Sequence, residues 1–382
     1  MTTTDESRRC FKRSNKGFFM IVWFVFLGLV SALFARYILT GINDMLAVGR
    51  DSMAIQIEIP EGASIGEISD IFKKNGLISE KEFFMLYAIA TKSGDKFSGG
   101  FYELNAGMDY QALLNHIKNK ANIRSVVDIT FTEGMNVAEC AELLDKNEIC
   151  SKEVFLKLCK SNEFDNDFPF LKNISNPTER IYKLEGYLFP DTYKFYHGED
   201  ASGVIHKILV NYKKHIIQKS SIEGYDAKVS VKELAEAKGI SAENLLNIAS
   251  LIQAEAADKA DMYKVSSVIH NRLSTLNSGG KNAFGEFSMN HLRIDATVYY
   301  PYRSKKAVPK ELSKKFVGLY DTYKIEGLPP GPICNPGMDA IMAALNPAKT
   351  DYYYYCHSAD GTAYYAKTSE AHVSNLKKAG LA

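Results

Sequence analysis

The sequence lacks the features of several common protein classes. Its 46 lysine and arginine residues nearly balance its 45 aspartate and glutamate residues, so the basic excess typical of nucleic-acid binding is missing. It contains no H-E-x-x-H motif, and Gly280-Lys281 lacks both the earlier glycine and the following Ser or Thr of a phosphate loop. We therefore set aside nucleic-acid, zinc-protease and nucleotide chemistry and favour a neutral or carbohydrate substrate.

Cysteine is scarce and irregularly spaced. None of the six cysteines forms a C-x-x-C pair: Cys10, Cys140, Cys150, Cys159, Cys334 and Cys356. We interpret them mainly as small buried apolar residues. A disulfide between two of those that follow the first stays open, because sequence alone does not pair them.

One long segment carries no charge. GFFMIVWFVFLGLVSALFA lies between Lys16 and Arg36, and its 19 residues would span roughly 28 Å as a helix, which matches a bilayer core. We predict a transmembrane helix within residues 17–40. Basic residues precede it, so the positive-inside rule predicts a cytoplasmic tail over 1–16 and a single-pass protein of the cytoplasmic membrane. A cleaved signal peptide is the alternative, which the long run and the missing A-x-A site disfavour.

The 382 residues exceed what one hydrophobic core usually supports, and an internal repeat follows the apolar segment. IEIPEGASIGEISDIFKKNGLISEKEFFML from Ile57 aligns without gaps on ITFTEGMNVAECAELLDKNEICSKEVFLKL from Ile129. Each copy opens with the period-two alternation of a half-buried strand. Ser64 with Glu67 and Ser79 with Glu82 predict two capped helices in the first copy.

The first copy, within residues 50–122, ends in a returning strand near Gly100 and thus reads as strand, helix, helix, strand. This order resembles the LysM module, and the resemblance implies binding to the N-acetylglucosamine backbone of peptidoglycan or chitin. A small scaffold domain that binds no sugar is the open alternative. We assign the second copy and a connecting part to residues 123–225 and a catalytic domain to 226–382, which gives an α+β protein overall.

The segment SAENLLNIASLIQAEAAD places a carboxyl group on the apolar side of a predicted helix. Ser241 is a natural N-cap, and Leu245, Ile248 and Ile252 form a stripe that Glu255 extends. A carboxylate on such a stripe loses hydration, which raises its pKa unless a cation pairs with it. Such a group can hold a proton near neutral pH and donate it to a glycosidic oxygen. The alternative is a solvated, idle glutamate at a frayed helix end.

Six ordered blocks of sequence resemble the endolytic murein transglycosylase family, also called YceG-like. They are EGYLFPDTY from Glu185, IASLIQAEA from Ile248, VIHNRL from Val268, RIDATVYY from Arg293, YDTYKIEGLPPGPICNPG from Tyr320 and ALNPAKTDYYYY from Ala344. The resemblance implies that Glu255 is the catalytic residue. The chain departs from the family pattern at Gln253, an acidic position there, at Ala296, a common proline there, and in the longer stretch from Ser274 to Leu292.

The resemblance also implies the reaction. In this family the 6-hydroxyl of the N-acetylmuramoyl residue attacks its own anomeric carbon, so one glutamate serves as acid and then as base and leaves a 1,6-anhydro end. No metal or cofactor is implied. The expected partners are glycan strands of peptidoglycan, the cytoplasmic membrane and peptidoglycan synthases. Polar residues in the matching blocks are candidates for substrate binding or support of the cationic transition state: Asn271, Asp295, Tyr299, Tyr187 and Asn335. Each also has a purely architectural interpretation.

Two features near the C-terminus concern the shape of the site. GLPPGPICNPG, from Gly327, has too much proline and glycine for a helix or central strand and predicts an ordered loop of the kind that shapes substrate clefts. DYYYYCHSADGTAYYA predicts a hairpin around Asp360-Gly361. Two alternatives to a lytic transglycosylase remain open: a noncatalytic wall-binding anchor that organises synthesis enzymes, and a true hydrolase.

Overall fold

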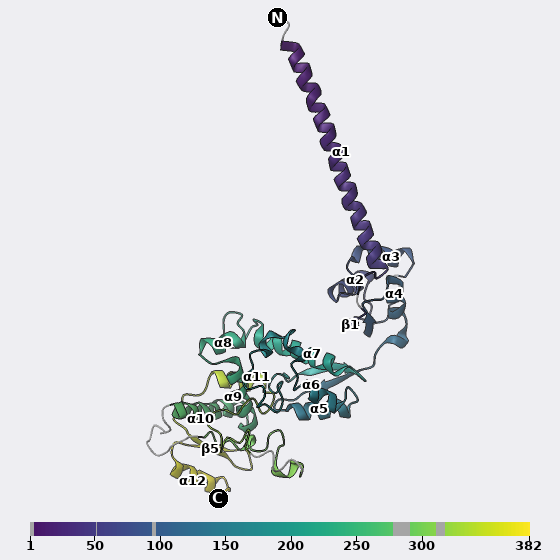
Figure 1. The fold of residues 1–382 in the computed structure, drawn as a ribbon. Coiled ribbons are helices and arrows are strands. Elements are labelled where there is room, and N and C mark those ends of the chain that lie inside the picture. Colours follow the sequence, from purple (N-terminus) through teal and green to yellow (C-terminus); the bar gives the residue numbers. More distant parts are fainter. Residues whose placement is uncertain (1–3, 51, 94–96, 278–290, 311–317) are drawn as a thin grey trace. The chain divides into compact units, whose positions relative to one another are not determined.

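The computed structural model describes residues 4–50, 52–93, 97–277, 291–310 and 318–382 (Figure 1). The chain divides into two compact units, Met1–Val126 and Val127–Ala382. Helices predominate, and each sheet of the described chain has two strands. The predicted α+β class is therefore confirmed in its coarse form, while the long connection predicted after Ser274 falls largely on residues outside the described ones.

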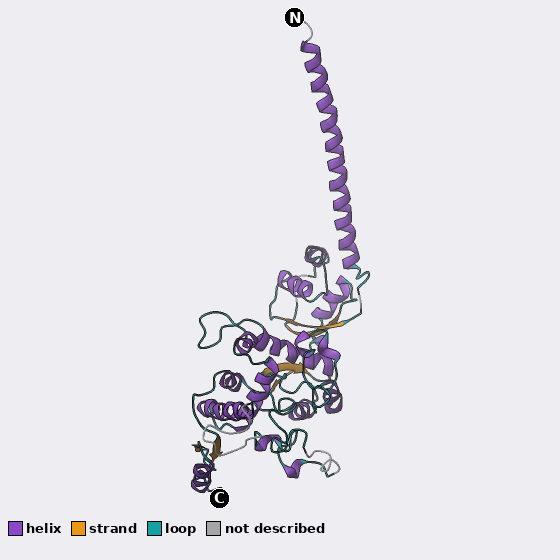
Figure 2. Cartoon of the chain, turned by 60° about the vertical axis from the view of Figure 1, so that its left-hand side comes forward, coloured by secondary structure: helices purple, strands orange, loops and turns teal. Residues whose placement is uncertain are grey.

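The first unit begins with a long helix, α1 (Thr4–Met45), drawn as one unbroken element in Figure 2. Its segment Phe18–Met45 is long and apolar enough to cross a membrane. The large apolar side chains from Phe18 to Phe34 are exposed, as they are on a helix that contacts lipid. The helix extends beyond the predicted 17–40 at both ends.

The rest of the first unit has the predicted order of strand, helix, helix and strand. Its elements are β1 (Ala54–Ile59), α2 (Ile65–Lys74), α3 (Lys81–Ala90), β2 (Gly100–Asn105), α4 (Tyr110–Lys118) and a 3-10 turn at Lys120–Asn122. β1 and β2 pair antiparallel, with Ile57 opposite Tyr102. The capping box of Ser64 and Glu67 is present at the start of α2. Alternate residues of β1 point inward, since Ile57 and Ile59 are buried.

The predicted capping box of Ser79 and Glu82 is wrong. The N-cap of α3 is Glu80, one residue after the Ser79 that the box requires. The side chain of Glu80 makes no capping hydrogen bond. Instead the buried carboxylate of Asp44, at the end of α1, accepts hydrogen bonds from the amides of Ser79 at 2.9 Å and Glu80 at 2.9 Å. A carboxylate from a distant part of the chain satisfies the free N–H groups of the helix start, so a local cap is unnecessary.

The second unit opens with the second repeat copy. β3 (Val126–Thr130), α5 (Val137–Lys146) and α6 (Lys152–Leu158) follow the order of the first copy, and β4 (Thr192–Tyr196) pairs with β3 after a connection that holds 3-10 turns at Glu163–Asp165 and Pro169–Leu171. Asn136 and Glu139 form a capping box at the position that Ser64 and Glu67 occupy in the first copy. The two copies therefore share their structure as well as their sequence pattern.

The remaining elements build the part of the unit that contains Glu255. They are α7 (Ala201–Tyr212) with a π-helical turn Lys213–Ile217, α8 (Val231–Ala237), α9 (Ala242–Glu255), α10 (Lys259–Asn277), 3-10 turns Asp295–Thr297 and Lys305–Ala307, α11 (Met338–Leu345), β5 (Tyr354–His357), β6 (Ala363–Ala366) and α12 (Ser369–Lys378). β5 and β6 form the predicted hairpin, with Gly361 at a positive φ of 86° in its turn.

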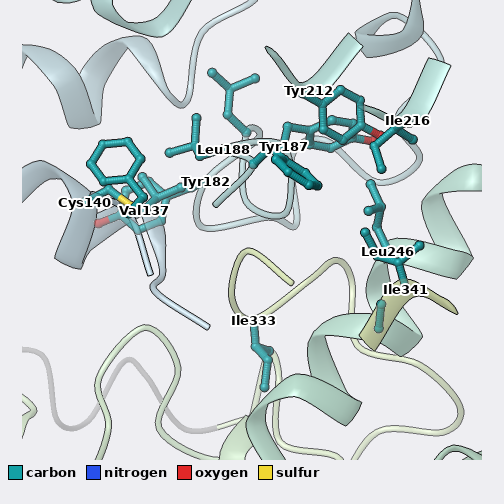
Figure 3. Close-up of a cluster of buried hydrophobic side chains, with 14 of the residues drawn as sticks. Val137, Cys140, Tyr182, Tyr187, Leu188, Tyr212, Ile216, Leu246, Ile333 and Ile341 are labelled. Atoms are coloured by element: carbon teal, nitrogen blue, oxygen red, sulfur yellow. The ribbon is translucent and has the colours of Figure 1, made fainter. Parts of the chain in front are cut away.

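One hydrophobic core joins the second repeat copy to the part of the second unit that contains Glu255. Figure 3 shows side chains from α5, from the 182–188 segment, from α7 and from α9 and α11 gathered in it, among them Tyr187, Tyr212, Leu246 and Ile341. Every residue of α9 from Leu245 to Ile252 is buried. The cysteines described in this unit are free, and most are buried, as expected of small apolar residues. α9 is thus a rigid element at the centre of the unit, and Glu255 is its last residue.

Candidate active site

Glu255 lies where α9 stops. The helix starts at the predicted N-cap, where the Ser241 hydroxyl accepts a hydrogen bond from the Asn244 amide at 3.1 Å. It ends because Ala256 adopts an extended conformation with φ −77° and ψ 143°. The carbonyl end of a helix is its negative pole, and this disfavours an ionised carboxylate there. The helix end thus adds to the effect of burial on Glu255.

A cavity of about 540 Å³ opens at Glu255. Its walls come from α9, α10, the segment before the Asp295–Thr297 turn, the Tyr323 region, β5 and α12. The lining residues are Glu255, Arg272, Arg293, Asp295, Tyr323, Tyr354, Tyr355, Cys356, His357, Ser369, His372, Leu376 and Leu381. Glu255 keeps part of its surface on this cavity although protein surrounds its carboxyl group on most sides. The group is therefore dehydrated yet reachable.

Two donors hold the carboxyl group of Glu255. The Tyr355 hydroxyl donates to one oxygen at 2.9 Å, and the Ala296 amide donates to the other at 3.2 Å. Burial raises the pKa of Glu255, and the two hydrogen bonds offset part of that rise because they favour the anion. The pKa of Glu255 is raised overall, so the group holds a proton to higher pH than an ordinary glutamate does. The two hydrogen bonds still stabilise the carboxylate when the proton leaves.

Asp295 is the second carboxylate on the cavity, and it is exposed. Its charge contributes to the raised pKa of Glu255, because two nearby like charges resist ionising together. The Tyr323 hydroxyl donates a hydrogen bond to Asp295 and so fixes its position. Among the five predicted supporting residues, Asp295 is the one that the structure brings to the cavity with Glu255.

The charge of Arg272 acts on Glu255, but its guanidinium is hydrogen-bonded elsewhere. It donates to the carbonyl oxygens of Tyr353 at 2.8 Å and Leu292 at 2.6 Å. Its charge also lies 5.7 Å from the centroid of the Tyr355 ring. Within the described residues no ion pair joins Arg272 to Glu255, and its charge lowers the pKa of Glu255 less than the hydrogen bonds from Tyr355 and Ala296 do. Arg272 therefore braces the walls of the cavity without neutralising the acid.

A second polar cluster includes His357, which lines the same cavity from β5. His357 bonds to Asp261 at 2.8 Å, and the Tyr365 hydroxyl donates to the other oxygen of the same carboxylate. This cluster ties β5 and β6 to the start of α10. Although burial alone would raise it, these hydrogen bonds hold the pKa of Asp261 below its usual value. The hairpin that carries Tyr355 is thereby fixed to the helix that follows α9.

The other predicted residues lie outside the cavity lining. Asn271 donates from its amide to the carbonyl oxygens of Thr350 and Tyr352, both at 2.9 Å, and so ties α10 to the chain that enters β5. Tyr299 is half-buried, and its carbonyl oxygen accepts from the Tyr302 amide at 2.7 Å. The contacts of Asn271 support the site indirectly, since they position the segment that leads to Tyr355.

Tyr187 and Asn335 belong to the core. Tyr187 packs on Tyr212 with ring centroids 5.1 Å apart (Figure 3). Asn335 is fully buried, accepts from the amides of Gly186 and Leu188, and donates to a carboxylate oxygen of Glu185 at 3.2 Å. These contacts are architectural.

Glu185 is a second buried carboxyl group, with no exposed surface. It accepts hydrogen bonds from the Val137 amide at 3.0 Å and the Tyr300 hydroxyl at 2.7 Å. Burial raises its pKa to about 8, and these donors offset part of the rise. Because Val137 is the first residue of α5, the carboxyl group sits at the N-terminal pole of that helix. It has a place in the packing of the second unit and no surface on the Glu255 cavity.

Sequence reasoning missed Tyr355, Tyr323 and the carbonyl contacts of Arg272. All three side chains lie in blocks that match the family, but nothing local distinguishes Tyr355 from its three tyrosine neighbours. The predicted proline-rich loop is present as a loop and packs along α9, where Asn247 donates to the Pro329 carbonyl oxygen at 2.7 Å. None of its residues from 327 to 337 lines the Glu255 cavity.

A larger cavity of about 1030 Å³ lies elsewhere in the second unit. Glu133, Asp191, Lys259 and Asp339 line it, and Glu255 does not. Lys259 and Asp339 form a salt bridge at 2.8 Å. Size alone does not identify a catalytic site. Burial raises the pKa of Glu133 on the larger cavity as well, but Glu133 is exposed and Glu255 is half-buried, so the smaller cavity holds the more dehydrated acid. Within the described residues no group of three His, Cys, Asp or Glu side chains is placed to hold a metal ion.

The fold and the Glu255 cavity define a class: an α+β protein with one buried proton-holding carboxyl group at the end of a core helix. The YceG-like family model matches residues 57–378. A relative from Bacillus subtilis named endolytic murein transglycosylase is 34% identical over 337 residues, which cover 85% of each chain. A Streptococcus pneumoniae protein of the same name is 26% identical over 94% of this chain and 64% of its own length.

A crystal structure of a yceG-like protein from Listeria monocytogenes is also similar. It has a TM-score of 0.51 and 25% sequence identity, and the match covers 84% of this chain and 98% of that one. The chain belongs to the YceG-like family. This kinship makes it an enzyme of the lytic transglycosylase class.

Proposed function

We propose that the protein cleaves the glycosidic bond between N-acetylmuramoyl and N-acetylglucosamine residues within peptidoglycan strands, without water, and leaves 1,6-anhydro ends. The observation that carries this proposal is the state of Glu255: burial raises the pKa of a carboxyl group that still reaches a cavity. The names of the relatives supply the murein substrate.

In the proposed reaction, Glu255 begins protonated and gives its proton to the oxygen that links the two sugars. The bond from the anomeric carbon to that oxygen breaks, and the N-acetylglucosamine hydroxyl leaves. The 6-hydroxyl oxygen of the same muramoyl residue bonds to the anomeric carbon, and its proton passes to the Glu255 carboxylate. The carboxyl group returns to its starting state, so one acid completes the cycle.

Other groups of the cavity assist Glu255. The Tyr355 hydroxyl and the Ala296 amide stabilise the carboxylate that exists between the two proton transfers. Asp295 supplies negative charge near the oxocarbenium-like transition state. Asn271 holds the chain that leads to β5, and Arg272 holds the walls. Tyr299, Tyr187 and Asn335 are proposed to act at most through the packing that supports these groups.

We further propose that α1 anchors the protein in the cytoplasmic membrane with its N-terminus in the cytoplasm. The length and apolar surface of α1 support this. The active unit would then meet new glycan strands close to the membrane, beside peptidoglycan synthases. The βααβ order of the first unit supports a LysM-like module that binds the sugar backbone.

Product analysis tests the reaction. Full-length protein in detergent is incubated with purified peptidoglycan, and the soluble products are identified by mass spectrometry. We expect 1,6-anhydro ends from the wild type and a loss of about 100-fold or more in their release with Glu255→Gln. Reducing ends heavier by one water would instead identify a hydrolase. Unchanged release by Glu255→Gln, or binding without any product from the wild type, would refute the proposal and leave a noncatalytic anchor.

A further inference from the structure

Helix α3 of the first unit has two apolar faces: the unit covers one of them, and of the other it covers only the first residue, Phe83. Phe84 and Ala88 point into the core and are fully buried. On another side, Phe83, Leu86 and Ile89 follow one another at helical spacing, and Leu86 and Ile89 are 64% and 63% exposed. A helix of a water-surrounded module does not need this second stripe, so it points to an apolar neighbour.

The first residue of this stripe, Phe83, contacts α1. The Phe83 ring meets the Tyr37 ring with centroids 5.1 Å apart. Phe83 also lies so close to Gly41 that a Cβ added there would come within 2.4 Å of the ring. The glycine therefore permits the close approach of the two helices, and the apolar surface of α1 continues onto α3.

Asp44 fixes this arrangement. Its carboxylate is 5% exposed and accepts from the amides of Ser79 and Glu80 at the start of α3 and from the Tyr110 hydroxyl of α4. The Arg50 guanidinium donates to the Asp44 carbonyl oxygen at 2.5 Å. The end of α1 is thus built into the first unit by buried polar contacts, and α3 is held at a set height along α1.

That height corresponds to the membrane surface. The uncharged part of α1 ends at Ala35. At ~1.5 Å per residue, Tyr37 lies ~3 Å beyond that point along the axis and Gly41 ~9 Å beyond it. The headgroup layer on each side of a bilayer is ~5–8 Å thick. The contact between α1 and α3 therefore begins at Tyr37 within the headgroup layer, where aromatic side chains are favoured, and reaches the outer edge of that layer at Gly41.

We propose that Phe83, Leu86 and Ile89 rest in the headgroup layer of the bilayer that α1 spans, so that the first unit is held against the membrane by α3 as well as by α1. This inference rests on the proposed membrane anchor. The bilayer is the occupant because the stripe is continuous with the lipid-facing surface of α1 and lies at the depth of the interface. α3 would lie along the membrane surface with the exposed Lys92 at its end toward the headgroups.

Tryptophan fluorescence in lipid vesicles tests the proposal, because the chain has a single tryptophan, Trp23, in α1. Full-length protein is reconstituted into phosphatidylcholine and phosphatidylglycerol vesicles whose acyl chains carry bromine close to the headgroup. Three forms are compared: the wild type, Trp23→Phe with Leu86→Trp, and Trp23→Phe with Glu58→Trp. Glu58 is an exposed residue of β1, and Figures 1 and 2 both show β1 at the end of the module away from α1.

We expect bromine to quench the tryptophan at position 86 several-fold more strongly than the one at position 58, with emission shifted to shorter wavelength. Adding Ile89→Glu to the Leu86→Trp form should reduce that quenching, because a charge in the stripe opposes insertion. Both positions are exposed, so circular dichroism should show an unchanged fold.

Two results would overturn the proposal, and they differ in meaning. If lipids with bromine deep in the acyl chains quench Trp23 while the tryptophan at position 86 matches that at position 58, the anchor stands and α3 does not touch the membrane. The stripe would then face a protein partner. If Trp23 itself is not quenched by any brominated lipid, the proposed anchor fails and the inference fails with it.

Discussion

The hydroxyl of Tyr355 donates a 2.9 Å hydrogen bond to the carboxyl group of Glu255, which lies 100 residues earlier in the chain. Arg272 faces the ring of the same tyrosine and binds the carbonyl oxygen of Tyr353. The hairpin thus delivers one donor to the end of α9 and is itself held by α10. Glu255 consequently combines a raised pKa with a ready means to stabilise its anion.

Tyr355→Phe should move the pH profile upward and lower the rate. Loss of a donor that favours the anion raises the pKa of Glu255 further, so the proton-donating form persists to higher pH. The high-pH limb of kcat should shift toward the alkaline side. A hydrogen bond to a charged group contributes about 1.5–3 kcal/mol, so the plateau rate should fall about 10- to 100-fold.

Rates of 1,6-anhydro product release across pH measure this effect. Tyr352→Phe is the matched control, because its ring packs on Tyr365 at 5.3 Å and the substitution keeps that contact. An unshifted limb in Tyr355→Phe would contradict the assigned role of the hydrogen bond.

Ala296→Pro should also raise the pKa of Glu255, because it removes the hydrogen bond to the other carboxyl oxygen of that residue. Proline has no N–H and removes the 3.2 Å hydrogen bond to Glu255, and Ala296→Gly keeps it. We expect the high-pH limb of Ala296→Pro to lie above that of both the wild type and Ala296→Gly. The position is one where the family commonly has proline, so the substitution should preserve the fold. Equal pH profiles for the proline and glycine variants would show that this amide does not set the pKa of Glu255.

Parts of the site were predictable and others were not, for a physical reason. The start of α9 at Ser241 and the approach of its apolar stripe to Glu255 depend on local spacing, which sequence records. Tyr355 and Asp44 act on groups far along the chain, and local patterns carry no record of such contacts. Asn335 stood out because it lies in a matching block, but a buried amide that satisfies backbone groups gives the same signal as a substrate ligand.

Glu185 should make the stability of the second unit depend on pH. Its folded-state pKa is raised from 4.5 to about 8, so the folded form binds more protons than the unfolded form between these values. The free energy of unfolding should therefore fall as pH rises through this window, by up to about 1.4 kcal/mol per pH unit from this group. Urea unfolding followed at a series of pH values measures the slope.

Glu185→Gln serves as the comparison, because it removes the titrating group and keeps the side-chain shape. Its unfolding free energy should vary less between pH values of about 5 and 8, because glutamine does not titrate. Parallel curves for the two proteins would mean that Glu185 keeps one protonation state throughout and that its burial is compensated by its donors.

Asp44→Ala should loosen α3 from the end of α1. The substitution leaves the amides of Ser79 and Glu80 without their acceptor and leaves the Tyr110 hydroxyl only the Glu80 carbonyl oxygen at 3.2 Å, so we expect a loss of about 2 kcal/mol or more in local stability. Hydrogen exchange of the full chain, read by mass spectrometry over residues 77–90, measures it. Asp70→Ala removes only an exposed ion pair with Lys81 and should change the exchange little. Equal protection in both variants would contradict the capping role.

Gln253→Glu should leave catalysis nearly intact although it restores the acidic residue of the family pattern. The Gln253 side-chain oxygen accepts a hydrogen bond from the Gly337 amide at 3.0 Å, and a glutamate oxygen can accept the same bond. The side chain belongs to the wall formed with Glu133 and Asp191 and does not line the Glu255 cavity. We expect kcat within about threefold of the wild type, since no interaction specific to the transition state is touched. A loss as large as that of Glu255→Gln would place Gln253 in the chemistry and require a site that extends to both faces of α9.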